Sequence, residues 1–159
     1  TSKRNDLALC SAMAPVPLTP DRSRLLGRVR QRGTAPELVV RAILSRHGHR
    51  YRLNNRNLPG SPDLSNTIRH KAIFVHGCFW HRHRGCRRTT TPKHNAEFWQ
   101  EKFERNIERD TQNIQKLKSR GFDVLVVWEC ETFAPNTLTA KLLNFWTSKY
   151  HAEHGAFTD

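Results

Sequence analysis

The stretch KAIFVHGCFWHRHRGC, residues 71 to 86, decides how the rest of the chain folds. It begins with a nearly continuous apolar run, which is typical of a strand buried on both faces. A second such run, DVLVVWEC at residues 123 to 130, predicts another fully buried strand. Residues 97 to 120, between the two runs, predict a long amphipathic helix. Strands and helices therefore alternate, which indicates an α/β fold with a central mixed β-sheet flanked by α-helices.

The segments outside these runs continue the alternation. Thr34 and Glu37 fit a capping box, in which a Thr N-cap is followed three residues later by Glu, and they predict a helix that ends at Gly48. Further elements are expected at residues 21–32 (a short helix), 51–53, 63–65 and 71–76 (strands) and 138–150 (an amphipathic helix).

The length of 159 residues suits one domain with a single core. We expect a flexible N-terminal arm at residues 1–20, where three prolines follow one another closely. The folded domain is expected at residues 21–150, and a C-terminal tail at residues 151–159.

The chain is strongly basic, with a formal net charge of +13. Such a charge indicates a polyanionic partner, because each phosphate that a cationic side chain neutralises releases a condensed counterion. No apolar run approaches the roughly 18 to 20 residues of a membrane span, and the sequence does not start with the apolar segment of a signal peptide. We therefore expect no membrane partner and a reducing, cytoplasmic compartment, where cysteines are free or bind metal.

Three potential metal ligands lie close together in the sequence: Cys78, His83 and Cys86. A tetrahedral zinc ion needs a fourth ligand. Cys130 is the candidate, because a thiolate at the end of the second apolar run could reach this segment if the two strands are neighbours. Such a closed site would be structural, and it would leave the two other histidines of the stretch free. The alternative is a set of unrelated buried cysteines.

The helix at residues 97 to 120 contains a carboxylate, Asp110, within its apolar stripe. A carboxylate among apolar residues is destabilising by several kcal/mol unless it is paired or hydrogen-bonded, so Asp110 needs a partner, for which a histidine is suitable. Alternatively, Asp110 lies at the edge of the stripe and reaches water or Arg109. The stripe consists of Phe103, Ile107, Ile114 and Leu117.

A second carboxylate, Asp63, stands at the start of a predicted strand. An acidic residue there, followed by a hairpin and a buried strand, matches the first half of the acidic pattern of many metal-dependent nucleases. The buried strand lacks the acidic residue that usually completes the pattern. It has His76 at its end, so an imidazole would occupy the place of the usual acidic ligand.

Taken together, these segments resemble the very short patch repair (Vsr) DNA mismatch endonuclease family. The resemblance extends from about Asp21 to Glu131 and is carried by RSRLLGRVRQRGTAPE, LPGSPD, IFVHGCFWHRHRGC, EFWQEKFERNIERD and VLVVWEC. It implies a restriction-endonuclease-like fold with a structural zinc. It also implies magnesium-dependent nicking of one DNA strand at T:G mismatches, which arise when 5-methylcytosine deaminates.

The resemblance also implies a biological setting. Family members act as monomers on double-stranded DNA, so we expect a nucleoid-associated bacterial protein. Mismatch-repair proteins and a cytosine-5 methyltransferase system are its expected partners.

The resemblance assigns roles to particular residues. Zinc would be bound by Cys78, His83, Cys86 and Cys130, in agreement with their spacing. Asp63 and the backbone carbonyl of Val75 would bind magnesium, while His76 and Glu37 would hold water molecules on that ion. His81 would be the general base, oriented by Asp110, which supplies the partner that the helix pattern requires.

Four apolar residues match side chains that wedge into the duplex beside the mismatch. A wedge is destabilising by a few kcal/mol per unstacked step, and this penalty is smaller at a mispaired site. For Trp99, the alternative is an ordinary core position on its helix. The four residues are Phe79, Trp80, Trp99 and, on the first helix, Leu26.

The segment HRHRGC and the basic loop at residues 87–94 depart from a well-known relative, so the sequence context read around the mismatch could differ. Two rival functions stay open at this point. One is a zinc-stabilised DNA-binding module without catalysis. The other is a nuclease on the same scaffold that cuts matched DNA in a restriction or mobile-element role.

Overall fold

A computed structural model describes residues 32–148 of the chain. The predicted N-terminal arm, the first helix with Leu26, the end of the last helix and the C-terminal tail lie outside the described residues.

Four strands form one mixed sheet in the order β1–β2–β3–β4. β2 is antiparallel to both of its neighbours, β1 and β3, whereas β3 and β4 are parallel. A parallel pair needs a long crossover, which α3 (Ala96–Ser119) provides. The mixed sheet predicted from the sequence is therefore confirmed. Its strands are β1 (Arg52–Leu53), β2 (Leu64–Asn66), β3 (Lys71–His76) and β4 (Asp123–Trp128).

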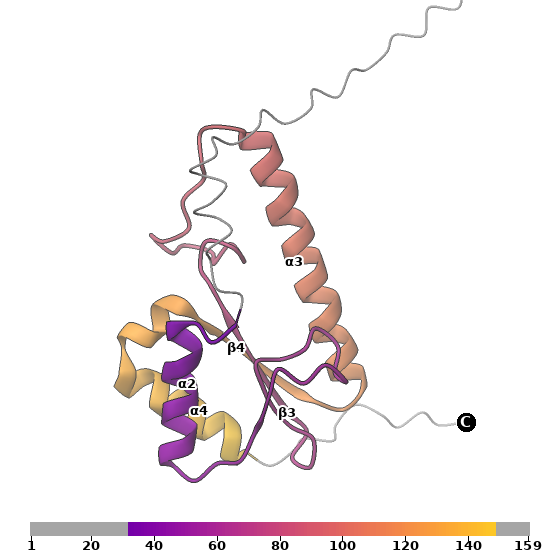
Figure 1. The fold of residues 1–159 in the computed structure, drawn as a ribbon, viewed down its shortest axis with the longest axis vertical. Helices are drawn as coiled ribbons and strands as arrows, with labels where there is room; N and C mark the ends of the chain where they lie inside the picture. The colour runs from indigo at the N-terminus through magenta and orange to yellow at the C-terminus, as the bar shows by residue number, and fades with distance from the viewer. Residues whose placement is uncertain (1–31, 149–159) are drawn as a thin grey trace, which may run out of the picture.

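Helices cover both faces of this sheet (Figure 1). α2 (Ala35–Arg46) and α4 (Pro135–Thr147) lie on one face, and a short 3-10 helix, η1 (Glu129–Phe133), connects β4 to α4. α3 lies on the other face, and its N-terminal half extends beyond the sheet (Figure 1). The predicted α/β class is confirmed.

Each face of the sheet has its own apolar core, because side chains alternate between the faces along a strand. On the α3 face, Ala72 and Phe74 pack with Leu117 and Phe122. The larger core on the opposite face consists of Val40, Ile43, Leu44, Leu64, Ile73, Val127, Leu138, Leu142 and Trp146. β3 contributes to both cores, which explains its nearly continuous apolar sequence.

β4 differs from its prediction as a fully buried strand. Only Val127 is fully buried along it, and the other residues are half-buried. β4 is the outermost strand of the described sheet, so it has a neighbour on one side only. Its last predicted residues also leave the strand, because Cys130 lies in η1.

The inward face of α3 differs from the predicted stripe in one position. Ile107 is 44% exposed and does not belong to it. Asp110, in contrast, lies on the half-buried side of the helix. Ile114 packs against the core on this face, as predicted. A heptad spacing, polar in the middle of the helix, relates the further inward residues: Trp99, Phe103, Asn106, Asp110, Asn113 and Leu117.

The capping box at the start of α2 is present as predicted. The carboxylate of Glu37 accepts hydrogen bonds from the Thr34 backbone N–H at 3.3 Å and from the Thr34 hydroxyl at 2.9 Å. The helix therefore begins at a position fixed by Glu37, which places this carboxylate at the N-terminal end of α2.

Candidate active site and metal cluster

A cleft of about 860 Å³ lies at the carboxyl end of β3. Its walls come from the start of α2, the loop before β2, the end of β3 with the turn that follows, and the middle of α3. The structure brings together in this cleft all five residues predicted to be catalytic: Glu37, Asp63, His76, His81 and Asp110.

Asp63 lies just before β2 and beside the end of β3. One of its carboxylate oxygens accepts a hydrogen bond from the Val75 backbone N–H at 2.7 Å. Burial raises the pKa of Asp63 to about 6, the negative charge of Glu37 acts in the same direction, and the hydrogen bond from Val75 opposes both. Asp63 is therefore a carboxyl group that loses its proton only near pH 6, because burial makes its charged form less favourable.

Glu37 has partners of its own in the cleft wall. Besides Thr34, its carboxylate accepts hydrogen bonds from the Gly33 backbone N–H at 2.9 Å and from the guanidinium of Arg41 at 2.8 Å. Its role in capping α2 is thus visible in the structure. A second role in holding water stays a prediction.

His81 and Asp110 form the closest polar contact of the cleft. Nδ1 of His81 is hydrogen-bonded to the Asp110 carboxylate. Burial would raise the pKa of Asp110, but this bond, the charges of the two cleft histidines and that of Arg109 outweigh burial and lower it. Asp110 thus has the histidine partner that its position requires. Arg109 approaches the other carboxylate oxygen only to 3.8 Å.

His76 is buried beside this pair. Its ring stacks on the ring of His81, with centroids 3.9 Å apart and planes 11° from parallel. Burial lowers the pKa of His76 to about 4, and the charge of His81 acts in the same direction. His76 is therefore a neutral imidazole at neutral pH, suited to hydrogen bonding and not to carrying charge.

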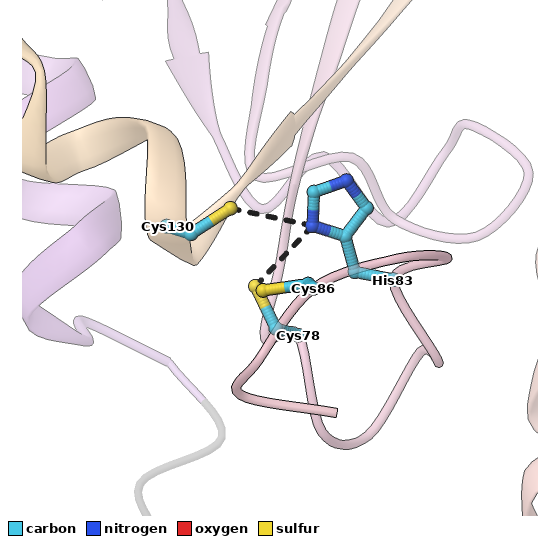
Figure 2. A group of neighbouring side chains, drawn as sticks. All are labelled: Cys78, His83, Cys86 and Cys130. Carbon is cyan, nitrogen blue, oxygen red and sulfur yellow. Dashed lines mark hydrogen bonds between the residues drawn. The ribbon is translucent and has the colours of Figure 1, made fainter. Parts of the chain in front are cut away.

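A separate cluster of three cysteines and one histidine lies next to the cleft. Figure 2 shows Cys78, His83 and Cys86 on the loop after β3, with Cys130 approaching from the start of η1. Nδ1 of His83 lies 3.3 Å from Sγ of Cys130 and 3.6 Å from Sγ of Cys78. The four potential donor atoms lie within 4.8 Å of one another.

The chemistry and spacing of these four donors suit zinc. Zinc–sulfur bonds of about 2.3 Å and zinc–nitrogen bonds of about 2.0 Å in a tetrahedron place sulfur and nitrogen roughly 3.5 Å apart, close to the separations observed. Burial raises the pKa of the Cys78 thiol to about 12, so a thiolate there needs a cation beside it. Neither His76 nor His81 belongs to this cluster.

Four aromatic rings pack together where the loop after β3 meets α3. Phe79 is at the centre, with ring centroids 5.0 Å from Trp80, 5.8 Å from Trp99 and 5.2 Å from Phe103. Of the three predicted wedge residues in the described part, Trp80 lines the cleft. Trp99 is only 3% exposed, so the cluster would have to open before this ring could enter a duplex.

The structure adds cleft residues that have no assigned role in the sequence analysis. Asn106 donates from its side-chain amide to the Trp80 carbonyl at 3.1 Å and thus fixes the turn that carries His81. Lys102 and Asn113 reach the cleft from the same helix, and Glu129 from the start of η1. A heptad reading of α3 would have found Asn106 and Asn113, because they continue the spacing of Phe103 and Asp110.

Fold and site together define the class of protein. A basic α/β protein with an oriented imidazole and a buried carboxylate in one cleft is typical of a hydrolytic enzyme that acts on an anionic substrate. Among the described residues, no helix has the length and apolar character needed to cross a bilayer.

Comparison with known proteins gives the family. The profile of the family described as "DNA mismatch endonuclease Vsr" matches residues 18–88. The DNA mismatch endonuclease Vsr of Escherichia coli (strain K12) is 35% identical over 144 residues, which cover 91% of this chain and 92% of that protein. The chain therefore belongs to the Vsr family of DNA mismatch endonucleases, and it is an endonuclease. A DNA-binding module without catalysis is not supported.

Other relatives are named for nicking. The type II nicking enzyme V.XorIIP of Xanthomonas oryzae pv. oryzae is 43% identical over 128 residues, which cover 80% of this chain and 93% of the relative. The type II nicking enzyme V.NmeAIP of Neisseria meningitidis serogroup A is 40% identical over 119 residues, which cover 75% of this chain and 84% of that relative. A general role in DNA nicking is thereby supported.

Proposed function

We propose that this chain cuts one strand of duplex DNA at T:G mismatches and so starts very short patch repair, with magnesium in the cleft and zinc in the Cys/His cluster. The observation that carries the proposal is the hydrogen bond between His81 and Asp110 in the cleft that also contains Asp63. It joins an acid–base pair to a carboxylate that can bind a metal ion, which suits phosphodiester hydrolysis. A single restriction-endonuclease-like domain is part of this proposal.

His81 is assigned to the proton of the attacking water. Because Asp110 holds Nδ1, Nε2 is the ring nitrogen left to accept that proton. The lowered pKa keeps Asp110 ionised at neutral pH, and its charge stabilises the imidazolium that forms. The water oxygen attacks phosphorus as its proton moves to His81, the bond from phosphorus to the 3′ oxygen breaks, and that oxygen takes a proton from solvent water. The products are a 3′-hydroxyl and a 5′-phosphate.

The surroundings of Asp63 suit magnesium, which prefers oxygen ligands. The N–H and C=O of one residue project from the same edge of a strand, so the Val75 carbonyl faces the side on which Asp63 accepts its hydrogen bond. When bound, the ion would stabilise negative charge on the phosphate and on the leaving oxygen. Glu37 and the neutral imidazole of His76 line the same cleft, and both are assigned to hold water molecules beside these oxygens.

Zinc is assigned a structural role. It would join the loop after β3 to the start of η1 through Cys78, His83, Cys86 and Cys130. The same loop carries His81 and the aromatic residues, so the ion would brace both.

Mismatch selectivity is assigned to the aromatic cluster of Phe79, Trp80 and Trp99. Opening a stacked step is destabilising by a few kcal/mol, and the penalty is smallest where the pair is already weak. The net charge of +13 would hold the duplex while the rings are inserted. Repair of deaminated 5-methylcytosine, alongside mismatch-repair proteins and a cytosine-5 methyltransferase, is the setting that follows.

The test is a nicking assay with magnesium on end-labelled duplexes that differ only in one pair: T:G, T:A, C:G and other mismatches. We expect nicking of the T strand at T:G, with Asp63→Ala and His81→Gln abolishing it. His49→Gln is the matched control, because His49 packs against Trp146 outside the cleft. Undiminished nicking by either cleft variant would remove that residue from the mechanism.

Nicking of matched DNA is the alternative function, because several relatives are named type II nicking enzymes. The same panel separates the two. Equal rates on T:G and T:A duplexes of one sequence would overturn mismatch specificity while leaving the hydrolytic mechanism in place.

A further inference from the structure

Trp128, the last residue of β4, lies between the Cys/His cluster and the cleft. Its ring stacks on that of His83, with centroids 4.2 Å apart and planes 5° from parallel. It also meets the ring of His76 edge-on, at 5.5 Å and 76°. Since His76 stacks on His81, four rings in direct contact lead from a predicted zinc ligand to the predicted general base.

The sheet explains this arrangement. His76 and Trp128 are direct partners in the parallel register of β3 and β4, so their side chains stand next to each other on one face. The Trp128 backbone N–H donates to Oε2 of Glu131 at 2.8 Å. This bond fixes the end of β4 at the point where the chain enters η1, which carries Cys130.

The chain of rings supplies a restraint that Asp110 alone does not. A single hydrogen bond at Nδ1 fixes one atom of the His81 ring and leaves the ring free to tilt about that contact. Stacking on His76 restricts the tilt of the ring plane. His76 is in turn held by ring contacts with Phe74 and Trp128, so the support ends on Trp128 and on His83 behind it.

We propose that Trp128 is a positioning residue, which holds the His76–His81 stack in place and makes its geometry depend on the Cys/His cluster. The cluster and the acid–base site share no ligand. Apart from the loop after β3, which carries residues of both, the indole ring is the contact through which one acts on the other. The effect on catalysis rests on the proposed function of His81, whereas the effect on the geometry of the ring does not.

The first experiment compares Trp128→Leu, which removes the ring, with Trp128→Phe, which retains a smaller one. We expect Trp128→Leu to lower the single-turnover nicking rate about 10- to 100-fold, the scale associated with a misplaced catalytic group. DNA affinity and zinc content should stay at the wild-type level, and Trp128→Phe should recover part of the rate.

Trp146→Leu is the matched control. Trp146 is 1% exposed in the core that α2 and α4 cover, so its loss removes the same kind of ring without touching the cleft histidines or His83. It should lower the melting temperature while leaving the rate of the folded protein unchanged. A rate loss in Trp128→Leu that does not exceed that of Trp146→Leu would overturn the proposal, as would full activity of Trp128→Leu.

The second experiment is independent of nicking. Imidazole resonances are followed by NMR in protein labelled at histidine, with the signals of His81 assigned by comparison with His81→Gln. Removing zinc with a chelator should shift the His81 signals in the wild type, and should have a smaller effect in Trp128→Leu, which lacks the ring. His81 signals that ignore zinc removal would contradict the coupling. If the wild type failed to nick T:G duplexes, the proposed function would fall while this measurement still decided the role of Trp128.

Discussion

Asp63 is a carboxylate held mostly out of water, with its pKa raised to about 6 by burial. Glu37 raises the pKa further, whereas the Val75 N–H, Arg41 and His81 lower it. At neutral pH the side chain is ionised, so the folded protein holds a charge that burial makes less favourable than it is in the unfolded chain. A residue retained in this state is expected to serve binding or catalysis and not the stability of the fold.

Asp63→Asn should therefore stabilise the protein at pH 7 in magnesium-free buffer while abolishing nicking. The folded pKa of about 6 lies above the ordinary value, so the stabilising contribution of the neutral acid is present below about pH 4 and lost as the pH rises through 6. The amide stays neutral throughout. Urea unfolding should show little difference at pH 4 and a gain on the order of 2 kcal/mol above pH 6.

Asp123→Asn provides a control of opposite sign for this measurement. Asp123 accepts a hydrogen bond at 2.5 Å from the ammonium group of Lys71, which is buried, so the amide would leave a buried cation without its counter-charge. This control should lose stability at pH 7. If Asp63→Asn were also destabilised there, the burial of an unfavourable charge at Asp63 would be refuted.

At the same scale, some site residues could be read from the sequence and others could not. Asp110 was found because a carboxylate on an inward face needs a partner, and the structure supplies His81. The prediction that Ile107 lies on that face is wrong, because an apolar side chain alone does not show which face of a helix its residue occupies. The sequence predicts Trp128 only as part of a strand, because its contacts with two histidines depend on the register of β3 and β4.

Among the elements, the basic loop between Cys86 and α3 is held in part by a side chain from the preceding turn. Arg82, which has a backbone φ of 55°, donates to the Thr90 carbonyl and to the Thr91 hydroxyl, both at 2.9 Å. Its guanidinium also lies 4.4 Å from the ring centroid of Phe103 on α3. Arg82 therefore connects the loop to the helix that carries the aromatic cluster.

Arg82→Ala should release this loop and weaken the binding of T:G duplexes, with a smaller effect on the cleavage step. Arg84→Ala is the matched control, because it removes the same charge from an exposed neighbour in the same turn. The affinity of Arg82→Ala, measured by fluorescence anisotropy, should fall about tenfold below that of the control, the size of one lost charged hydrogen bond. Equal affinities of the two variants would show that charge alone matters there.

For the whole molecule, the fold class followed from two apolar runs separated by one long amphipathic helix, because a parallel pair with a helical crossover has few other solutions. The burial of β4, in contrast, could not be predicted from these runs. β4 has nearly the same apolar sequence as β3 but lies at the edge of the described sheet, and strand order is a property of the assembled sheet. The Cys/His cluster was predictable in composition, since three of its members are close in sequence and the fourth follows from the neighbouring strands.

The cluster should stabilise the whole domain, because a metal ion there would join the loop after β3 to the end of β4 across a long stretch of chain, and its binding energy would be folding energy. Cys130→Ala should therefore lose zinc, measured by elemental analysis, and melt well below the wild type, with excess magnesium giving no recovery. Cys10→Ala, at the one cysteine of the sequence that is not assigned to the cluster, should keep both properties. Zinc binding should also weaken as the pH falls, since protons compete for thiols such as Cys78, whose pKa burial raises to about 12. A Cys130→Ala protein that retained wild-type zinc and melting temperature would show that this residue does not close the site.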